Sequence, residues 1–523
     1  MPVFEIFNMN RLSFALKMLS VAPLLVVSEH SLAKVIDGTT LDIDSSTAVF
    51  NYDLINDATL NAVGAKTAGI SVQGSTLNLT GSEVNAIGKA GVSLQGGTAT
   101  ITGSTISSDQ VGLVVSYGVA DSRSSSADVI GSTITGVTHG IVVNGLSVLN
   151  LSGSTVSGTG NSAIGLRMFN STVNASDSVI TGNRAGIQIS LGPDIDGKNT
   201  LVLSDKTHVE GLAGSAILVD TLGAGAVVAD IIVRDQSTLK GSNGTLMEVV
   251  RGAEGNLTVD NSDLVGNIVA DDMSTANVTL QNQATLTGKL DNVQSLTVNS
   301  DARWIMDGNG TVENLSLNDG GVQFGKPGDF YSLSVANLSG TGGTFYMYNN
   351  FTTGQISTLT VTGTASGNHL VALESSGTEP VAPGSTAVVH IEAGDASFAL
   401  AGGMVSLGAF DYDLIKHGEN DWYLDTTSRV ISPGTRSVMA LFNAAPTVWY
   451  GELSTLRSRM GDVRMDQGQA GGWMRAYGNR LPNRLSRIKF SSGWKCSPHW
   501  ITQRANVWRG ISTPWRLKTF SKR

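Results

Sequence analysis

Residues 333–350 read LSVANLSGTGGTFYMYNN, and residues 393–425 read AGDASFALAGGMVSLGAFDYDLIKHGENDWYLD. Both segments contain short runs in which apolar and polar residues alternate, for example around Leu333 and Val335, and glycine, asparagine or serine separates the runs. A period of two between turn residues is typical of β-strands. The stretch therefore indicates a β fold.

Aromatic residues are concentrated in this stretch, although only 6% of the chain is aromatic. A stack of strands exposes its core and its unpaired strand edges at the end unless large side chains cover them. We therefore predict a C-terminal β cap over residues 332–428. The residues that we expect to form it are Phe345, Met347, His369, Gly394, Phe398, Tyr412 and Trp422.

Upstream of the cap, a sequence repeat extends over residues 34–331. Its unit is apolar-x-apolar-x followed by a turn residue, as in Leu149 and Leu151 before Gly153. A short strand that recurs in this way, with no helical pattern between repeats, is what one coil of a parallel β-helix needs. The turn residues, 18 to 30 residues apart, are Gly81, Gly103, Gly131, Gly153, Asp177, Asp205, Asp235, Asn261, Asn282, Ser300, Asp319, Asn337 and Gly363.

A single coil cannot bury its apolar face, so coils stack and share one continuous core. We predict an all-β fold, a right-handed parallel β-helix (a solenoid) of roughly 17 coils with the cap at its C-terminal end. An array of β-sandwich domains is the alternative, but it would need hairpin turns at regular intervals of roughly 8 to 12 residues.

The composition fits an ordered β protein. The chain has 523 residues, with 62 Gly, 11 Pro and a formal net charge of −9. Glycine and proline together are close to the average for proteins, so the sequence is not of low complexity. Cys496 is the only cysteine, which excludes an intrachain disulfide framework, so a regular hydrogen-bonded core must provide the stability.

Residues 1–33 have the pattern of a signal peptide. Arg11 and Lys17 precede an apolar run from Met18 to Val27, and small residues follow at positions 31 and 33. This order of charge, apolar run and small residues is typical of an export signal, and the run is too short to span a bilayer. A buried N-terminal element is the alternative.

The hydrophobic period changes in the linker region, residues 429–472. Apolar residues follow one another at steps of three and four, among them Leu441, Val448 and Leu456. This spacing predicts an amphipathic helix, with Ser432 as its N-cap and Pro433 at its first position.

The motifs of the cap follow one another in a specific order: SGTGGTFYM at 339–347, ASGNH at 365–369, SGTEP at 376–380, GDASFALA at 394–401, LGAFDYDL at 407–414 and WYL at 422–424. In this order they resemble the distal passenger region of pertactin-like autotransporters of Gram-negative bacteria. Residues 356–361, ISTLTV, depart from the family pattern because no acidic residue precedes the leucine, which affects one local contact.

The resemblance implies type V secretion, in which outer-membrane translocation machinery exports the passenger to the cell surface for adhesion or a similar virulence contact. It also implies that the linker helix threads a membrane β-barrel. The first strand of that barrel would contain Trp473, Tyr477 and Gly478. No motif identifies the host or cell-surface ligand.

The resemblance ends at about residue 481. From there the chain has ten Lys and Arg, no Asp or Glu and four of the eight Trp, whereas the first 480 residues hold all 43 acidic residues. We therefore expect residues 473–523 to be a truncated or frame-shifted barrel start with an aberrant basic tail, which makes a periplasmic location an alternative to the outer membrane or cell surface. A nucleic-acid-binding tail is a further alternative, although we predict no nucleic-acid partner.

We predict no catalytic, cofactor-binding or metal-binding residue, and no enzymatic activity. The sequence has no G-x-S-x-G, P-loop, H-E-x-x-H or EF-hand pattern, and none of its seven histidines lies at metal-ligand spacing from another. Asp271 and Asp272 keep one alternative open, a polysaccharide-active β-helix enzyme, because glycosidases use two carboxylates. A non-functional gene remnant is the second alternative.

Overall fold

The computed structural model describes residues 33–190, 198–221, 225, 227–350, 353–375 and 385–442. The described residues divide into two units. The larger unit contains residues 33–407 and 412–429, and the smaller one contains residues 408–411 and 430–442. The predicted signal peptide, most of the linker region and the predicted barrel start lie outside the described residues.

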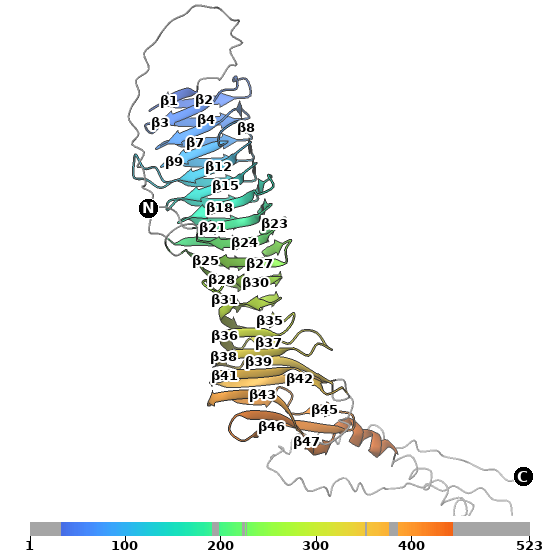
Figure 1. Ribbon diagram of the computed structural model, residues 1–523. Helices are drawn as coiled ribbons and strands as arrows, with labels where there is room; N and C mark the ends of the chain where they lie inside the picture. Colours follow the sequence, from blue (N-terminus) through green and yellow to red (C-terminus); the bar gives the residue numbers. More distant parts are fainter. Residues whose placement is uncertain are drawn as a thin grey trace, which may run out of the picture. The chain divides into compact units, whose positions relative to one another are not determined.

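The described part of the larger unit is a parallel β-helix (Figure 1). One coil consists of β9 (Val92–Gln95), β10 (Thr98–Thr102) and β11 (Thr105–Ser108), and this three-strand unit recurs along the chain. Strands at the same place in successive coils pair in parallel, which places each coil directly above the one before. The predicted all-β parallel β-helix is therefore confirmed, and the alternative of a sandwich array is wrong.

The strands form four parallel sheets. The first sheet contains β1 (Lys34–Asp37), β3 (Tyr52–Ile55), β6 (Ile70–Gln73), β9, β12 (Val111–Ser116), β15 (His139–Asn144), β18 (Ile164–Phe169), β21 (Ala185–Ser190), β24 (Ser215–Asp220), β27 (Thr245–Val250), β30 (Asn267–Ala270) and β33 (Leu290–Asp291). The second sheet contains β2 (Thr40–Asp44), β4 (Thr59–Val63), β7 (Thr76–Thr80), β10, β13 (Ser126–Ile130), β16 (Val148–Ser152), β19 (Thr172–Ser176), β22 (Asn199–Ser204), β25 (Val228–Arg234), β28 (Glu254–Asp260), β31 (Thr275–Gln281), β34 (Val293–Asn299), β36 (Gly310–Asn318), β38 (Ser332–Thr341), β41 (Thr358–Ala365) and β43 (Ser385–Gly394). The third sheet contains β5 (Lys66–Thr67), β8 (Glu83–Ala86), β11, β14 (Thr133–Gly136), β17 (Thr155–Gly158), β20 (Val179–Gly182), β23 (His208–Gly211) and β26 (Thr238–Gly241).

The fourth sheet takes over from the third in the later coils. It contains β29 (Asp263–Val265), β32 (Thr285–Thr287), β35 (Arg303–Ile305), β37 (Gly321–Gln323), β39 (Thr344–Asn350), β42 (Asn368–Ser375) and β44 (Ser397–Leu400), with β40 (Gln355–Ile356) paired to β39. The remaining strands are β45 (Val405–Leu407), β46 (Phe410–His417) and β47 (Asp421–Ile431). The second sheet supplies one parallel strand to each of sixteen coils, close to the roughly 17 that the repeat predicts.

The core consists of apolar columns that run from coil to coil. Every second residue of the second-sheet strands points inwards, and the pairs that the repeat singles out are fully or almost fully buried: Leu77 and Leu79, Leu149 and Leu151, Leu201 and Leu203, Ile231 and Val233, Val278 and Leu280, and Leu296 and Val298. Each such side chain contributes roughly 1.5–3 kcal/mol by leaving water. The third sheet adds a narrower column, with one large apolar residue in each coil.

The corner after each second-sheet strand needs a residue that tolerates positive φ. Eleven of the thirteen predicted turn residues have φ between +45° and +58°, among them Gly81, Asp177 and Asn261. Glycine, asparagine and aspartate adopt this left-handed conformation at the lowest cost. The prediction is wrong for Asn337 and Gly363, which lie inside β38 and β41, where the register shifts at a bulge and the strand continues through the corner.

A ladder of buried hydroxyl groups supports the same corner in the earlier coils. The Ser104 hydroxyl accepts a hydrogen bond from the Ser82 N–H at 3.1 Å and donates one to the Thr102 carbonyl at 2.9 Å. Ser132 repeats both bonds in the next coil, at 3.0 Å to the Ser104 N–H and 2.9 Å to the Ile130 carbonyl. Because each hydroxyl joins two coils, a buried polar corner costs little.

The later coils are built differently. The first sheet ends at β33, so the coils from β36 onwards contain strands of the second and fourth sheets only. Large side chains replace the small ones of the narrow column, as shown by Trp304, Phe324 and Phe345, each of which is at most 1% exposed. At the end of the column, β47 pairs antiparallel with β43 and interrupts the parallel ladder.

The smaller unit contains a helix at residues 433–442. The Thr435 N–H donates to the Ser432 hydroxyl at 3.2 Å and the Arg436 N–H donates to the Ser432 carbonyl at 2.9 Å, so Ser432 is the N-cap and Pro433 the first helical residue. Leu441 is 75% exposed on this helix. Within the described residues, no helix has the length and apolar character needed to cross a membrane.

Candidate functional site

Four of the seven cap residues that the sequence predicts lie in one aromatic stack inside the larger unit. The rings of Phe345 and His369 are 6.0 Å apart, those of His369 and Phe398 are 5.6 Å apart, and those of Phe398 and Trp422 are 4.9 Å apart. The first and last of these contacts are edge-on, a favourable arrangement for aromatic pairs. The four rings come from β39, β42, β44 and β47, so the stack ties the last coils together.

The register of the fourth sheet explains why these residues meet. Phe345 pairs with Val371 and His369 with Phe398, so inward-pointing residues of β39, β42 and β44 lie in neighbouring columns. Alternation along each strand then brings Phe345, Met347 and Phe398 to the same interior. The sequence carries this pattern, but which rings touch depends on the register between strands that are more than twenty residues apart.

Gly394 stands at a corner that excludes any side chain. Its φ is +116°, and a Cβ there would overlap the carbonyl oxygen of Ala365 in the preceding coil. Gly367 and Gly340, each two residues beyond the residue aligned with Gly394 in the two preceding coils, also have positive φ, of +94° and +104°. The predicted importance of Gly394 therefore has a local cause, which is that successive backbones approach each other too closely for a Cβ.

His369 is buried in the stack as a neutral imidazole. It is 2% exposed, its Nε2 donates to the Ser366 carbonyl at 3.0 Å, and its Nδ1 has no hydrogen-bond partner among the described residues. Burial lowers the pKa of His369 below its ordinary value, and the bond to Ser366 only partly opposes this shift. The cap therefore disfavours protonation of this residue.

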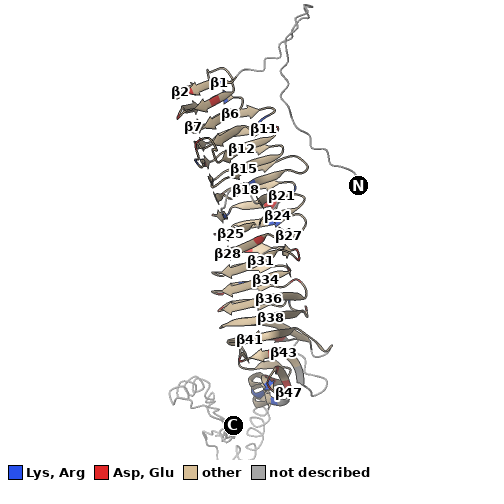
Figure 2. Cartoon of the chain, turned by 60° about the vertical axis from the view of Figure 1, so that its left-hand side comes forward, with Lys and Arg blue, Asp and Glu red and all other residues tan. Residues whose placement is uncertain are grey.

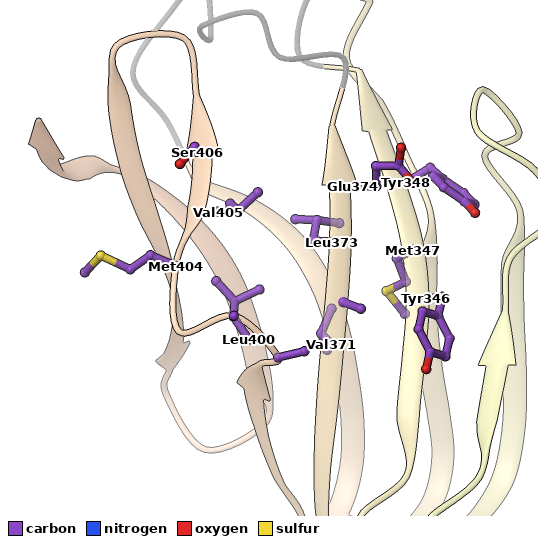
Figure 3. A pocket seen from close by; sticks show the side chains of 13 residues that line it. Tyr346, Met347, Tyr348, Val371, Leu373, Glu374, Leu400, Met404, Val405 and Ser406 are labelled. Carbon is purple, nitrogen blue, oxygen red and sulfur yellow. The ribbon is translucent and has the colours of Figure 1, made fainter. Parts of the chain in front are cut away.

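An apolar cleft of about 370 Å³ opens next to the stack (Figure 3). Its inner wall contains Met347, Val371 and Leu373, and Leu400 and Val405 come from the segment that leaves β44. The cleft exists because β44 ends at Leu400, whereas β42 continues to Ser375 with no β44 residue beside its last part. Met404, 45% exposed, lies at the mouth.

The rim of the cleft is polar. Tyr346 lies on the rim, and the Arg303 guanidinium stacks over its ring at 4.0 Å. The Tyr348 hydroxyl accepts a hydrogen bond from Gln323 Nε2 at a long 3.4 Å, and Glu374 stands exposed beside it. The polar rim and the apolar inner wall together suit an apolar side chain.

The remaining predicted site residues fall in three places. Tyr412 is 2% exposed in β46, and Met347 is fully buried at the base of the cleft. Leu441 is exposed on the helix of the smaller unit. Five others, Val448, Leu456, Trp473, Tyr477 and Gly478, lie outside the described residues, so their predicted roles stay predictions.

Sequence reasoning missed two cation–π contacts and the cleft itself. Lys416 lies 4.6 Å from the Trp422 ring and covers the end of the stack. The cleft had no signal in the sequence, because it depends on where β44 ends beside the longer β42. The contact between Arg303 and Tyr346 joins strands that are distant in the sequence, whereas Lys416 and Trp422 lie on the consecutive strands β46 and β47.

Asp271, one of the two carboxylates behind the enzyme alternative, acts as a turn acceptor. It accepts hydrogen bonds from the Arg251 N–H at 2.6 Å and the Met273 N–H at 3.1 Å. Bonds from Ser274 and Arg251 lower the pKa of Asp271, the opposite of what a general acid requires. Within the described residues, no group of three or more His, Cys, Asp or Glu side chains could hold a metal ion.

Two family models match this chain. Residues 312–426 match the family Pertactin, which covers the later coils, the stack and the cleft. Residues 68–224 match the right-handed β-helix region, which covers the earlier coils and agrees with the predicted handedness.

Several of the curated relatives that match are named as autotransporters. Autotransporter CRAC of Citrobacter rodentium is 34% identical over 39% of this chain and 14% of its own length, and the BrkA autotransporter of Bordetella pertussis is 25% identical over 68% and 38%. The autotransporter adhesin/invasin TibA of Escherichia coli O78:H11 is 37% identical over 28% and 17%. The serine protease EspC of E. coli O127:H6 is 27% identical over 37% and 15%.

The chain thus spans between about one seventh and two fifths of the length of these relatives. The predicted resemblance to pertactin-like autotransporter passengers is confirmed by the family models and the relatives together.

Proposed function

We propose that this chain is the passenger of a type V autotransporter, exported through the outer membrane and displayed at the cell surface for adhesion or a similar contact. The observation that carries the proposal is the aromatic stack at the C-terminal end of the solenoid, in the region that matches the Pertactin family. A relative that is named an adhesin/invasin favours adhesion over other surface roles.

The stack would act as the starting point of folding outside the cell. The last coils bury the rings of Phe345, Phe398 and Trp422, and the ring contacts of the stack lie between strands of these coils. A folded cap presents a complete strand edge, β36 or β38, on which the preceding coil can pair and bury its apolar face. Folding would then proceed from the C-terminal end, and each new coil would draw more chain outwards.

A domain exchange tests the export step. We would fuse residues 34–442 to the linker and barrel of the BrkA autotransporter and treat intact cells with an external protease. We expect the passenger to be cleaved on intact cells, and a Phe398→Ala/Trp422→Ala double variant to be cleaved much less. Retention of the unaltered fusion in the periplasm would contradict the proposal.

Adhesion is tested separately with cells that display the fusion. We expect these cells to adhere to a host-cell layer more than cells that display the barrel alone. Equal adhesion of the two strains, with display verified by antibody, would leave export standing and remove adhesion as the role of this passenger.

The enzyme alternative has one relative in its favour, since EspC is named a serine protease. The present sequence has no G-x-S-x-G motif, and Asp271 is engaged by the backbone of its own turn. We therefore keep the absence of enzymatic activity as a prediction. Hydrolysis of a polysaccharide that disappears in an Asp271→Asn/Asp272→Asn variant would overturn it.

A further inference from the structure

A second cleft, of about 400 Å³, lies near the N-terminal end of the solenoid, far from the stack in the sequence. Its floor is formed by the ends of three neighbouring first-sheet strands, where Ile55, Gln73 and Gln95 point outwards in one column. Its wall is the loop of residues 117–124, which connects β12 and β13. None of the site residues predicted from the sequence lies here.

The loop is held in a fixed shape and leans back over earlier coils. Gly118 and Arg123 exchange two backbone hydrogen bonds, at 2.8 and 3.3 Å, and the Ser125 hydroxyl closes the base by donating to the Ser116 carbonyl at 2.6 Å. Arg123 then reaches Asp57, sixty-six residues earlier, at 3.5 Å.

Two glycines make room for this arrangement. A Cβ on Gly74 would lie 2.6 Å from the Asp121 carboxylate, and one on Gly118 would lie 2.9 Å from the Gly96 Cα. Gly74 and Gly96 also have φ of +55° and +69°, so both corners are already shaped for glycine. The glycines at the corners of these coils therefore leave room for the loop of residues 117–124. The open polar cleft lies between the corners and this loop.

The polar groups of the cleft are largely free for a ligand. The side chains of Gln73 and Gln95 are exposed, lie side by side on paired strands, and make no hydrogen bond to any residue that the structure describes. Asp57 is 86% exposed, and its bond to Arg123 is long. Together these groups offer amide donors and acceptors, carboxylate acceptors and guanidinium donors within one cleft.

We propose that this cleft binds a neutral saccharide of about two sugar units. Planar amide, carboxylate and guanidinium groups can each bond two neighbouring hydroxyls, and Ile55 and Val119 supply an apolar contact for a sugar ring. The volume lies within the range of small-ligand sites. The inference deepens the proposed adhesion and rests on it for its biological use, but not for the binding itself.

The charge of the cleft and its surroundings excludes an acidic ligand. Asp57 and Asp121 outnumber the one cation, Arg123, and residues 34–428 contain 38 Asp and Glu against 15 Lys and Arg. Charged side chains are also sparse along the solenoid as a whole (Figure 2). An anionic saccharide or a nucleic acid would therefore be repelled.

An extended peptide is disfavoured for a different reason. Peptides that bind to sheets add a strand to a free edge. Here β6 is already paired on both sides, with β3 and β9, so the floor of the cleft offers no free edge. Saccharide recognition needs no such edge.

The test is calorimetric titration of the purified full chain with lactose, cellobiose and N,N′-diacetylchitobiose, each compared with a uronic-acid disaccharide. We expect saturable binding of at least one neutral disaccharide and none of the acidic one. A Gln73→Ala/Gln95→Ala variant should bind at least about tenfold more weakly, because two hydrogen bonds are lost. Gln110→Ala, an exposed glutamine at another corner, is the matched control and should bind like the unaltered chain.

Three results would overturn the proposal: no saturable binding of any neutral disaccharide, tighter binding of the acidic one, or equal weakening by Gln110→Ala. Thermal unfolding of each variant shows whether it is folded. An Arg123→Ala variant changes the opposite wall of the cleft and should also weaken binding. Display of the passenger plays no part in these measurements, so failure of the proposed export and failure of the saccharide site can be told apart.

Discussion

The earlier coils, residues 59–262, and the cap coils, residues 310–425, bury their corners and cores in different ways. The earlier coils repeat one solution, with a hydroxyl ladder at the corner and a column of Val and Ile on the third sheet, so each coil contacts its neighbours alike. Outside, the same coils carry a second ladder, in which the Asn150 amide donates to Asp128 and the Asn174 amide to Asn150. The cap coils have rings of different sizes that fit only each other.

This difference teaches how the two regions can be stabilised. In a repeating ladder, the loss of one contact is local, because the coils on either side keep their own bonds. In the cap, each ring contacts several strands, so the loss of one ring weakens the packing of several strands at the C-terminal end of the solenoid. The earlier coils stack on this end. The substitutions below compare a site in one region with a control in the other region or at a similar position in the same region.

The largest effect is expected for Phe398→Ala in the stack. It removes a buried ring that contacts Phe345, His369 and Trp422, which should cost about 3–5 kcal/mol of unfolding free energy. Denaturant unfolding followed by circular dichroism measures it. Val156→Ala in the earlier coils is the comparison and should cost clearly less, since it removes fewer atoms. Equal losses would mean that the stack is no better packed than a repeat column.

A smaller loss is expected for Gly394→Ala. The new Cβ would overlap the Ala365 carbonyl in addition to the strain of positive φ, so the cost should exceed that of Gly418→Ala, where φ is +65° but no atom lies within 4 Å of the new Cβ. We expect about 1 kcal/mol for the control and roughly 2–3 kcal/mol more for Gly394→Ala. Thermal unfolding of both variants gives the difference, and similar midpoints would show that the backbone can relax there.

The hydroxyl ladder contains its own control. Ser132→Ala leaves the buried Ser104 N–H without that acceptor and should cost about 1–3 kcal/mol. Ser237 occupies the equivalent corner four coils later, but its hydroxyl has no partner within the described residues. Ser237→Ala should therefore be neutral or slightly stabilising by chemical denaturation. A loss as large as that of Ser132→Ala would contradict the view that the ladder works through its hydrogen bonds.

The sequence predicts most of the repeat and little of what differs between coils. The corner residues from Gly81 to Asp319 were predictable because a left-handed corner restricts residue type at a fixed place in each coil. Asn337 and Gly363 were misassigned because these same residue types also tolerate a bulge inside a strand. The end of the first sheet at β33, and with it the change to two-strand coils, has no local signal.

The site divides in the same way. The sequence pattern places Phe345, His369, Phe398 and Trp422 among the predicted cap residues. In the structure the rings of these four residues contact one another in a stack. Neither cleft was predictable, since the first depends on where β44 stops beside β42 and the second on a loop that reaches coils sixty residues earlier. Such contacts between distant segments are set by register and stacking, which the order of residue types in one strand does not specify.

The smallest expected effect is a pH dependence confined to the cap. Burial lowers the pKa of His369 below its ordinary value of 6.5, so the unfolded chain takes up a proton at a higher pH than the folded chain does. Stability from this residue is therefore fully present above about pH 6.5 and is lost as the pH falls below it, by at most about 1.4 kcal/mol for each pH unit. Unfolding at pH 7.5 and at pH 5 would be followed by tryptophan fluorescence, and the difference from a Trp422→Phe variant gives the signal of Trp422, which lies in the same stack.

His369→Leu should remove the part of the pH dependence that the Trp422 signal reports. His139→Gln is the control in the earlier coils, because burial and the nearby Arg167 lower the pKa of His139 to about 4. If the two regions unfold separately, this variant should lose the acid sensitivity of the circular dichroism signal. It should keep the acid sensitivity of the Trp422 fluorescence. If His139→Gln instead abolishes the fluorescence change as well, the cap and the earlier coils unfold as one unit, and the cap would not be the independent end on which the solenoid is built.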